Sequence, residues 1–202
     1  MEAFKNFCVD LGSNNPTPGG GAALALVLAF GASASEKALR FSPNDFTDEF
    51  LNIFLEVRDA GLKLSLDDQD AFRKWMEARK LPKQTDEEKK IREEKVNYYA
   101  KETILVPYQV AKLSVKLLEA ILDFIPHSNK WLISDLGVGA SCAKSAFESA
   151  LFNIYINFPY LKDKELYIEI EHFIKENEEY VKKISESIYS QCMEVINSKK
   201  TS

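Results

Sequence analysis

A turn rich in proline and glycine, Pro16–Gly21, is the first stretch of this chain whose residue types suit chemistry. Its prolines fix φ, its consecutive glycines permit many backbone conformations, and the small apolar run 22–27 that follows is typical of a buried helix. A glycine turn that opens a helix leaves backbone N–H groups unpaired, and these groups can hold an anion or a developing negative charge. A structural turn that passes close to a neighbour needs the same residues, so spacing alone leaves both interpretations open.

Two carboxylates stand in surroundings that suit proton transfer. Asp68 shares a predicted helix face with Phe72, Trp75 and Arg79. A carboxylate among aromatic side chains acquires a raised pKa, which suits a general acid, whereas an ion pair with Arg79 would give it a structural role. Asp135 lies near the start of another predicted helix, where the helix dipole favours the charged carboxylate. Stabilising that first turn is an equally ordinary role for Asp135.

Composition excludes several classes of function. With 202 residues and a net charge of −5, the chain is long enough for a sizeable core and disfavours an extended nucleic-acid-binding surface. Its scattered cysteines, without a C-x-x-C pair, favour reduced thiols and a cytoplasmic location. The longest apolar run, 22–34, is too short to span a membrane, and the N-terminal residues do not resemble a secretory signal. His127 and His172 lack ligand-spaced partners, so we expect no metal site.

The apolar residues recur with a helical period, and no stretch alternates for long enough to predict a strand. Breaking and capping signals, among them Ser42–Asp45 and the capping box Thr85–Glu88, divide the chain into helices. The predicted helices cover residues 3–12, 21–41, 46–81, 85–125, 130–158 and 164–197. Small residues in the second and fifth of these predict close packing between them. We therefore expect an all-α fold, a multihelical bundle of long and short helices in a single domain over 1–202. The charged segment 85–105 would project in a helical hairpin that serves dimerisation.

The glycine turn is also the first of several segments that resemble, in the same order, the cyclodeaminase/cyclohydrolase family. That family includes the cyclodeaminase part of formiminotransferase-cyclodeaminase and the stand-alone methenyltetrahydrofolate cyclohydrolases. The resemblance covers residues 4 to 160. Although no single segment is decisive, the segments together identify the family because they occur in the same order along the chain. The further segments are Asp68–Phe72 (Asp-x-x-Ala-Phe), Leu81–Lys83 with Glu87, Glu88 and Arg92 (Leu-Pro-Lys…Glu-Glu…Arg), Val106-Pro107, Asn129 with Ser134-Asp135, and Asn153 with Asn157.

The resemblance implies folate one-carbon chemistry in an all-α homodimer that acts at the N5/N10 bridge of tetrahydrofolate. A formiminotetrahydrofolate cyclodeaminase closes the N5-formimino group onto N10 and releases ammonia, which gives 5,10-methenyltetrahydrofolate. A 5,10-methenyltetrahydrofolate cyclohydrolase adds water to that bridge and opens it to 10-formyltetrahydrofolate. Both reactions pass through a tetrahedral carbon, and both need protons moved between nitrogen, oxygen and solvent. The resemblance implies no cofactor beyond the tetrahydrofolate substrate, and it allows a separate formiminotransferase as a partner. It does not choose between the two reactions.

For this chemistry, Asp135 is the first candidate for the acid/base group and Asp68 the second. Asp135 and Asn153 share one helix face, but a separation of 18 residues places them about 27 Å apart along a helix. They can serve opposite ends of a long ligand, one can be structural, or a dimer can bring another copy near. We expect Asn153 to be structural and to bond a neighbouring helix.

The candidate substrate-binding residues follow from the same segments. The backbone of the glycine turn would line the pocket and offer N–H groups to a carboxylate or a pterin oxygen. Lys83 and Arg92 would meet the anionic glutamate tail, including that of a polyglutamylated folate, although both are also ordinary solvated charges. Asn129 and Ser134 would orient the substrate or Asp135, although both are common at helix starts. The turn residues concerned are Pro18, Gly19, Gly20 and Gly21.

Two departures from the family pattern leave a second hypothesis open. Lys37-Ala38 stands where the family often has Met-Val, and Trp131 stands where it often has a second Asn. A non-catalytic helical binding or interaction module on the same fold would tolerate such changes. If Trp131 fills a pocket beside Asp135, the module is favoured, whereas an open polar cleft beside the glycine turn favours the enzyme.

Overall fold

The computed structural model describes residues 1–42 and 47–198, which form six α-helices and three 3-10 helices without a strand. The α-helices are α1 (Glu2–Leu11), α2 (Gly20–Arg40), α3 (Thr47–Arg79), α4 (Asp86–Phe124), α5 (Ile133–Asn157) and α6 (Lys164–Ser198). The 3-10 helices are η1 (Ile125–His127), η2 (Lys130–Leu132) and η3 (Phe158–Tyr160). The predicted all-α fold is confirmed, and each predicted helix is present. Most of the predicted break at Ser42–Asp45 lies outside the described residues.

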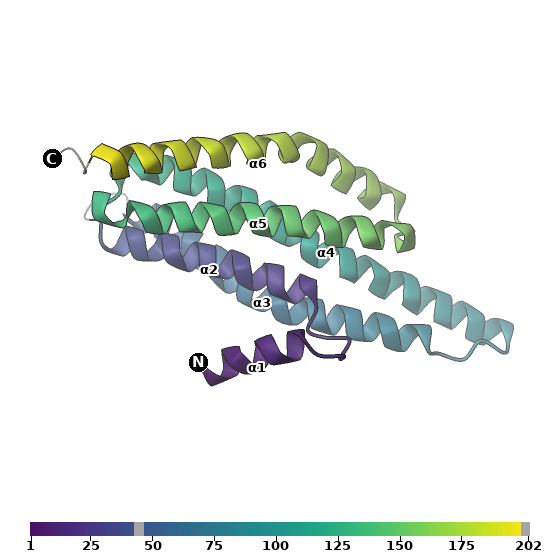
Figure 1. The fold of residues 1–202 in the computed structure, drawn as a ribbon. Helices are drawn as coiled ribbons and strands as arrows, with labels where there is room; N and C mark the ends of the chain where they lie inside the picture. The colour runs from purple at the N-terminus through teal and green to yellow at the C-terminus, as the bar shows by residue number, and fades with distance from the viewer. Residues whose placement is uncertain (43–46, 199–202) are drawn as a thin grey trace.

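Helices α2 to α6 form a long bundle (Figure 1). Helix α2 packs against α3 and α5, α4 packs against α3 and α5, and α6 covers α4 and α5. The core between them contains the fully buried rings of Phe54, Phe124 and Phe147, from α3, α4 and α5. Among the described helices, α2 alone is long and apolar enough to cross a membrane, but most of it is buried inside the bundle, as in an ordinary core helix.

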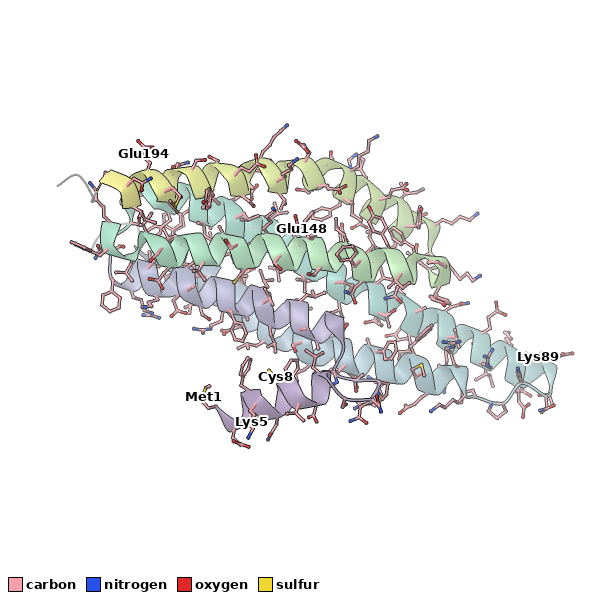
Figure 2. The ribbon with its side chains drawn as sticks, viewed as in Figure 1. Met1, Lys5, Cys8, Lys89, Glu148 and Glu194 are labelled. Atoms are coloured by element: carbon pink, nitrogen blue, oxygen red, sulfur yellow. The ribbon has the colours of Figure 1, made fainter. Side chains whose placement is uncertain are left out.

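Helix α1 lies beside the bundle rather than in it (Figures 1 and 2). None of its residues is buried, and Phe4 meets Phe30 of α2 edge-on, with ring centroids 5.9 Å apart. The turn that carries the prolines and glycines connects α1 to the first residue of α2. This turn therefore lies between a surface helix and the most buried helix of the bundle.

Glycine residues bring α2 within backbone contact of both α3 and α5. A methyl group at Gly61 of α3 would lie 2.8 Å from the Ala25 carbonyl oxygen and 3.1 Å from the Ala29 Cβ on α2. On the other face of α2, a methyl group at Gly31 would lie 2.9 Å from the Gly139 carbonyl oxygen of α5. The predicted close packing of the two small-residue faces is confirmed. Gly61, within the predicted helix 46–81, marks the second close contact.

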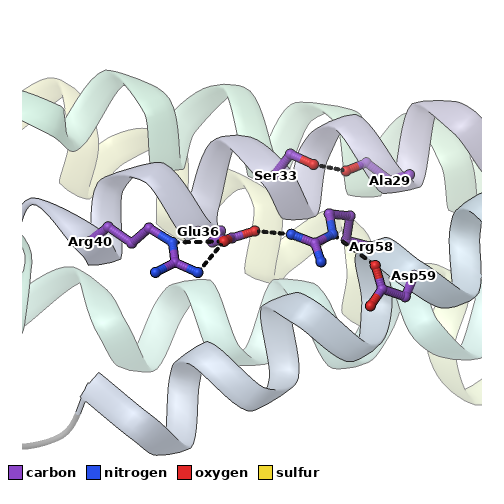
Figure 3. A network of polar contacts seen from close by, with 6 residues as sticks. All are labelled: Ala29, Ser33, Glu36, Arg40, Arg58 and Asp59. Atoms are coloured by element: carbon purple, nitrogen blue, oxygen red, sulfur yellow. Dashed lines mark hydrogen bonds and ion pairs between the residues drawn. The ribbon is translucent and has the colours of Figure 1, made fainter.

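An ion-pair network also joins α2 to α3 (Figure 3). Glu36 of α2, which is only 9% exposed, accepts from Arg40 Nε at 2.7 Å and from Arg58 Nη1 of α3 at 2.7 Å. Arg58 Nε donates to Asp59 at 2.8 Å. Since both carboxylate oxygens of Glu36 are paired, its burial costs much less than that of an isolated charge. Close glycine contacts and this network together fix the register of α2 on α3.

The C-terminal end of α3 and the first turns of α4 extend past the end of α5 and α6 as a helical hairpin, with Lys89 near its tip (Figures 1 and 2). The predicted capping box starts α4, because Thr85 Oγ1 accepts from Glu88 N and Glu88 Oε2 accepts from Thr85 N, each at 3.1 Å. The guanidinium of Arg92 closes the hairpin by donating to the Arg79 carbonyl oxygen at 3.2 and 3.3 Å. The predicted projection is therefore present, whereas its role in dimerisation stays a prediction.

Replacing Gly61 with alanine tests the close contact of α2 and α3. The new methyl group would press on backbone atoms of α2 that cannot move alone. We expect the free energy of unfolding in urea to fall by about 1–2 kcal/mol, because overpacking exceeds the gain in helix propensity. Gly12→Ala is the matched control, since a methyl group there meets nothing closer than 3.6 Å. Equal stability of Gly61→Ala and wild type would contradict the contact.

Candidate active site

The carboxylate of Asp68 lies directly on the N-terminus of α2. It accepts a hydrogen bond from the backbone N–H of Ala22. A Cβ on Gly21 would overlap the Asp68 carboxyl group, so only glycine allows this approach. Gly19 is the N-cap of α2 and its backbone is extended, with φ −122°. No acceptor among the described residues takes the N–H groups of Gly20 and Gly21. These N–H groups remain available to an anion or a polar ligand.

Burial determines the protonation of Asp68. Desolvation raises its pKa from 3.8 to about 6, and the hydrogen bond from Ala22 partly opposes this shift. Within residues 1–42 and 47–198, no cation lies within ion-pair distance of the Asp68 carboxylate. The guanidinium of Arg79 instead stacks on the Trp75 ring, 4.6 Å from its centroid. The alternative in which Arg79 pairs with Asp68 is therefore wrong, and Asp68 can both accept and donate a proton near neutral pH.

A cavity of about 330 Å³ opens beside Asp68 and the glycine turn. Residues of α3, α4, α5 and η3 complete its walls. The volume lies at the lower end of the range for small-molecule sites. Gly19, Gly20 and Gly21 line this cavity as predicted, together with Pro16 and Thr17, whereas Pro18 lies in the turn without lining it. A cleft is therefore present beside the glycine turn, with a lining that is partly polar and partly apolar.

Two asparagines of α5 provide the polar wall that faces the glycine turn. Asn153 Nδ2 donates to the Ser149 carbonyl oxygen of its own helix at 3.1 Å, and Asn157 Nδ2 donates to the Asn153 carbonyl oxygen at 2.9 Å. Both side chains line the cavity, and their Oδ1 atoms accept no hydrogen bond from the described residues. The expectation that Asn153 bonds a neighbouring helix is wrong. The i, i+4 spacing of these amides at the end of a helix was the available signal for their role in the cavity.

Aromatic rings form the remaining wall. The Trp75 ring meets the ring of Tyr160 at a centroid distance of 5.1 Å and that of Phe72 at 5.8 Å. All three line the cavity, with Trp75 and Phe72 from α3 and Tyr160 from η3. A cavity with a carboxylate and amides on one side and flat rings on the other suits a planar heterocycle that carries polar edges. Tyr160 was missed in the sequence because its contact with Trp75 depends on the turn after α5.

The other predicted acid/base group lies at the opposite end of α2. Asp135 is paired with Lys37, whose Nζ lies 3.5 Å from Asp135 Oδ1. Lys37 follows Gly21 by 16 residues, which corresponds to about 24 Å along α2. Asp135 therefore lies far from the cavity that contains Asp68. One chain does not bring the two candidate carboxylates together.

Asn129 and Ser134 lie near Asp135 and away from the cavity beside Asp68. Asn129 fastens the turn after α4, since its Nδ2 donates to the Phe41 carbonyl oxygen at 2.9 Å and its Oδ1 accepts from Trp131 N at 2.9 Å. Ser134 lines a different cavity of about 760 Å³ between α5 and α6. Trp131 is 79% exposed and fills no pocket beside Asp135. The arrangement expected for the non-catalytic module is absent from the described residues.

Lys83 and Arg92 lie on the α3–α4 hairpin and do not line the cavity. Lys83 is exposed in the turn after α3, and Arg92 is half-buried against the end of α3. Helix α3 leads from Asp68 past Trp75 and Arg79 to this turn. The two cations therefore lie beyond the aromatic end of the cavity, where only an extended ligand would reach them.

The chain is similar to known proteins in both sequence and fold. The family model described as formiminotransferase-cyclodeaminase matches residues 3–176. A methenyltetrahydrofolate cyclohydrolase of Methylorubrum extorquens is 30% identical over 81% of this chain and 82% of its own length. The formimidoyltransferase-cyclodeaminase of Mus musculus is 28% identical over 80% of this chain but only 31% of its own length. A crystal structure of formiminotetrahydrofolate cyclodeaminase from Thermotoga maritima has the same fold, with a TM-score of 0.81, 22% identity and coverage of 95% of this chain and 96% of that chain.

The raised pKa of Asp68 predicts a dependence of stability on pH. Because the folded-state pKa of about 6 exceeds the ordinary 3.8, the folded protein binds more protons than the unfolded chain between these values. Wild-type stability therefore loses a contribution as pH rises through this window. The uncharged variant Asp68→Asn escapes this loss, so its stability relative to wild type should rise by about 2–3 kcal/mol between pH 4 and pH 7.5.

Urea unfolding at the two pH values measures this difference. Asp67→Asn is the matched control, because Asp67 is the neighbouring carboxylate and pairs with Lys63 on the surface. We expect Asp67→Asn to show no comparable rise. A constant difference between Asp68→Asn and wild type across the pH range would mean that Asp68 is not held in an unfavourable charged state.

Proposed function

Because the chain belongs to the formiminotransferase-cyclodeaminase family, as the resemblance in its sequence indicated, we propose that it acts at the N5/N10 bridge of tetrahydrofolate. Its reaction is formiminotetrahydrofolate cyclodeamination, with release of ammonia, or the related hydrolysis of 5,10-methenyltetrahydrofolate. The observation that carries this proposal is the Asp68 carboxylate, which lies unpaired on the N-terminus of α2 inside a cavity. A proton-transfer group in such a cavity is what both reactions need.

In the hydrolytic reaction, water attacks the methenyl carbon and the ionised Asp68 takes a proton from that water. The tetrahedral carbon then keeps its bond to N10 and loses its bond to N5, and the protonated carboxyl returns the proton to N5. The hydroxyl on that carbon releases its proton to solvent as the formyl C=O bond forms. The product is 10-formyltetrahydrofolate. A carboxyl with a pKa of about 6 is well matched to this sequence, since it accepts and releases a proton within the same turnover.

In the cyclodeaminating reaction, N10 attacks the carbon of the protonated formimino group and loses its own proton to Asp68. The same proton is delivered to the nitrogen that leaves as ammonia, and the methenyl bridge remains. The unpaired N–H groups of Gly20 and Gly21 and the amide oxygens of Asn153 and Asn157 provide donors and acceptors for the polar edges of the pterin. One site can therefore support both reactions, and the choice depends on whether water or ammonia is the small partner.

The direction of α3 indicates where the rest of the ligand would lie. With the bridge at Asp68, the p-aminobenzoyl ring would lie along the aromatic wall and the glutamate tail would point toward Lys83 and the hairpin. The guanidinium of Arg92 already donates to the Arg79 carbonyl oxygen, so Lys83 is the more available cation for a carboxylate or a polyglutamate chain. Neither reaction transfers electrons, so we propose no metal and no cofactor beyond the tetrahydrofolate substrate.

We also propose a cytoplasmic homodimer that binds neither nucleic acid nor membrane. The free thiols of Cys8, Cys142 and Cys192 support a reducing compartment. Large apolar side chains on the surface of α5, among them Phe152 at 75% and Ile156 at 71% exposure, support an interface with a second copy. A separate formiminotransferase would supply the formimino group for cyclodeamination. The mouse relative is named for both activities, and this chain matches 31% of its length.

Two assays on purified protein test the proposed reaction. One follows the loss of 5,10-methenyltetrahydrofolate absorbance and the other follows ammonia release from 5-formiminotetrahydrofolate. We expect turnover in at least one assay, and Asp68→Asn should lower kcat about 10²–10⁴-fold, which is the usual contribution of a general acid or base. Inactivity of the wild type in both assays would favour the non-catalytic binding module.

Variants at other carboxylates make the assignment specific. Asp67→Asn serves as the control, because this surface carboxylate lies beside Asp68 in sequence and pairs with Lys63. We expect it to keep kcat within about twofold of wild type, as surface substitutions generally do. Asp135→Asn decides between the two candidates. A larger loss in Asp135→Asn than in Asp68→Asn would transfer the acid/base role to Asp135.

A further inference from the structure

The Trp75 indole presents a buried hydrogen-bond donor that the fold does not use. Trp75 is only 6% exposed, and its Nε1 is buried without a hydrogen-bond partner among the described residues. A buried donor without an acceptor carries the full cost of its desolvation, so native structures nearly always pair it. Trp75 also lines the cavity beside Asp68. An unpaired donor in the wall of a cavity indicates that the acceptor comes from a bound molecule.

The position of Trp75 on α3 indicates which part of that molecule it meets. Trp75 follows Asp68 by seven residues, so the two share one face of the helix and lie about 10 Å apart along its axis. The direction from Asp68 to Trp75 leads away from the glycine turn toward Arg79 and the hairpin. On the proposed function, the reacting bridge lies at Asp68 and the anionic tail lies toward the hairpin. The segment that passes Trp75 is therefore the p-aminobenzoyl group and its amide.

We propose that Trp75 is a specificity-determining residue whose Nε1–H donates to the amide carbonyl oxygen between the p-aminobenzoyl ring and the first glutamate of the substrate. This inference rests on the proposed function and adds to it a contact far from the reacting carbon. The carbonyl oxygen of an amide is a strong acceptor, and the indole N–H donates only. A site with such a donor discriminates against a ligand that lacks the acceptor, because the donor then stays unpaired.

The surroundings of the indole fix its orientation for this role. The Arg79 guanidinium covers one face of the ring at 4.6 Å, and the Tyr160 ring meets it at an interplanar angle of 62°. Phe72 contacts it from the preceding turn of α3, at 5.8 Å. Tyr160 is itself 45% exposed. The indole is thus held in place by contacts with three neighbouring side chains.

The chain offers a built-in control for the test, because it contains only 2 tryptophans and Trp131 is 79% exposed at the far end of the bundle. The experiment records the two indole N–H resonances of ¹⁵N-labelled protein, assigned with a Trp131→Phe variant, during titration with 5-formyltetrahydrofolate. We expect the Trp75 indole proton to move downfield at saturation while that of Trp131 stays in place. A second titration with 6-methyltetrahydropterin, which lacks the benzoyl amide, should leave the Trp75 resonance without that downfield shift.

Kinetics of Trp75→Phe provide the second measurement, since phenylalanine keeps a ring and removes the donor. We expect KM for the folate substrate to rise about tenfold and kcat to stay within about twofold, as for the loss of one hydrogen bond that is equally strong in ground and transition states. Affinity for 6-methyltetrahydropterin should not change. If Trp75→Phe does not fold, the titration of the wild type still decides, because it needs no substitution at this position.

The outcomes separate this inference from the proposed function. If the wild type turns over or binds the folate but the Trp75 resonance does not move downfield, or if Trp75→Phe keeps its KM, the contact is overturned and the reaction stands. A downfield shift with both ligands also overturns it, since the acceptor then belongs to the pterin. Absence of both folate binding and turnover in the wild type overturns the proposed function and, with it, the role of Trp75.

Discussion

The contact of α2 with α3 at backbone distance is the constraint on which the candidate site depends. The two helices run in opposite directions, so a contact between Gly61 and the Ala25–Ala29 turn places Asp68, seven residues further along α3, level with the first turn of α2. A larger residue at Gly61 would separate the helices, and the Asp68 carboxylate would no longer meet Gly21. The ion-pair network around Glu36 holds the same register at the other end of the contact. The packing of Gly61 against α2 thus determines the position of the Asp68 carboxylate, two helical turns away.

This register creates a carboxylate with opposing influences on its charge. Burial against the apolar start of α2 disfavours ionisation, while the N–H of Ala22 and the positive end of the helix favour it. A surface carboxylate would stay ionised, and a fully buried one without the hydrogen bond would stay protonated. The balance leaves Asp68 with a pKa of about 6, near enough to neutrality that both forms are populated during a reaction. The glycine turn therefore acts on the proton-transfer group as well as on the ligand.

Much of this could be predicted from the sequence because the information was local. The helical period, the capping box at Thr85 and the small-residue faces of α2 and α5 each follow from a few neighbouring residues, and all are present. The association of Asp68 with the glycine turn could be expected only through the family resemblance, since 47 residues separate Gly21 from Asp68. The placement of Asn153 in the cavity and the unpaired donor of Trp75 depend on contacts among α3, α5 and η3. The helical period of a sequence predicts the helix face on which a residue lies, but it does not predict which residues of other helices that face contacts.

Local signals in the sequence placed Asp135 before Asp68 as the acid/base candidate, whereas the proposed function assigns that role to Asp68. Asp135 has a helix start nearby and a serine before it, which in sequence is the stronger signal for a functional carboxylate. In the structure it pairs with Lys37, a residue near the end of α2, whose Nζ lies 3.5 Å from Asp135 Oδ1. Among residues 1–42 and 47–198, Asp68 has no such cation, and it is desolvated by a helix that the sequence places 47 residues away. A buried carboxyl acquires a pKa suited to proton transfer when no cation beside it stabilises the charged form. For assigning the acid/base group, the lack of a cation beside Asp68 among the described residues is therefore more informative than the helix start beside Asp135.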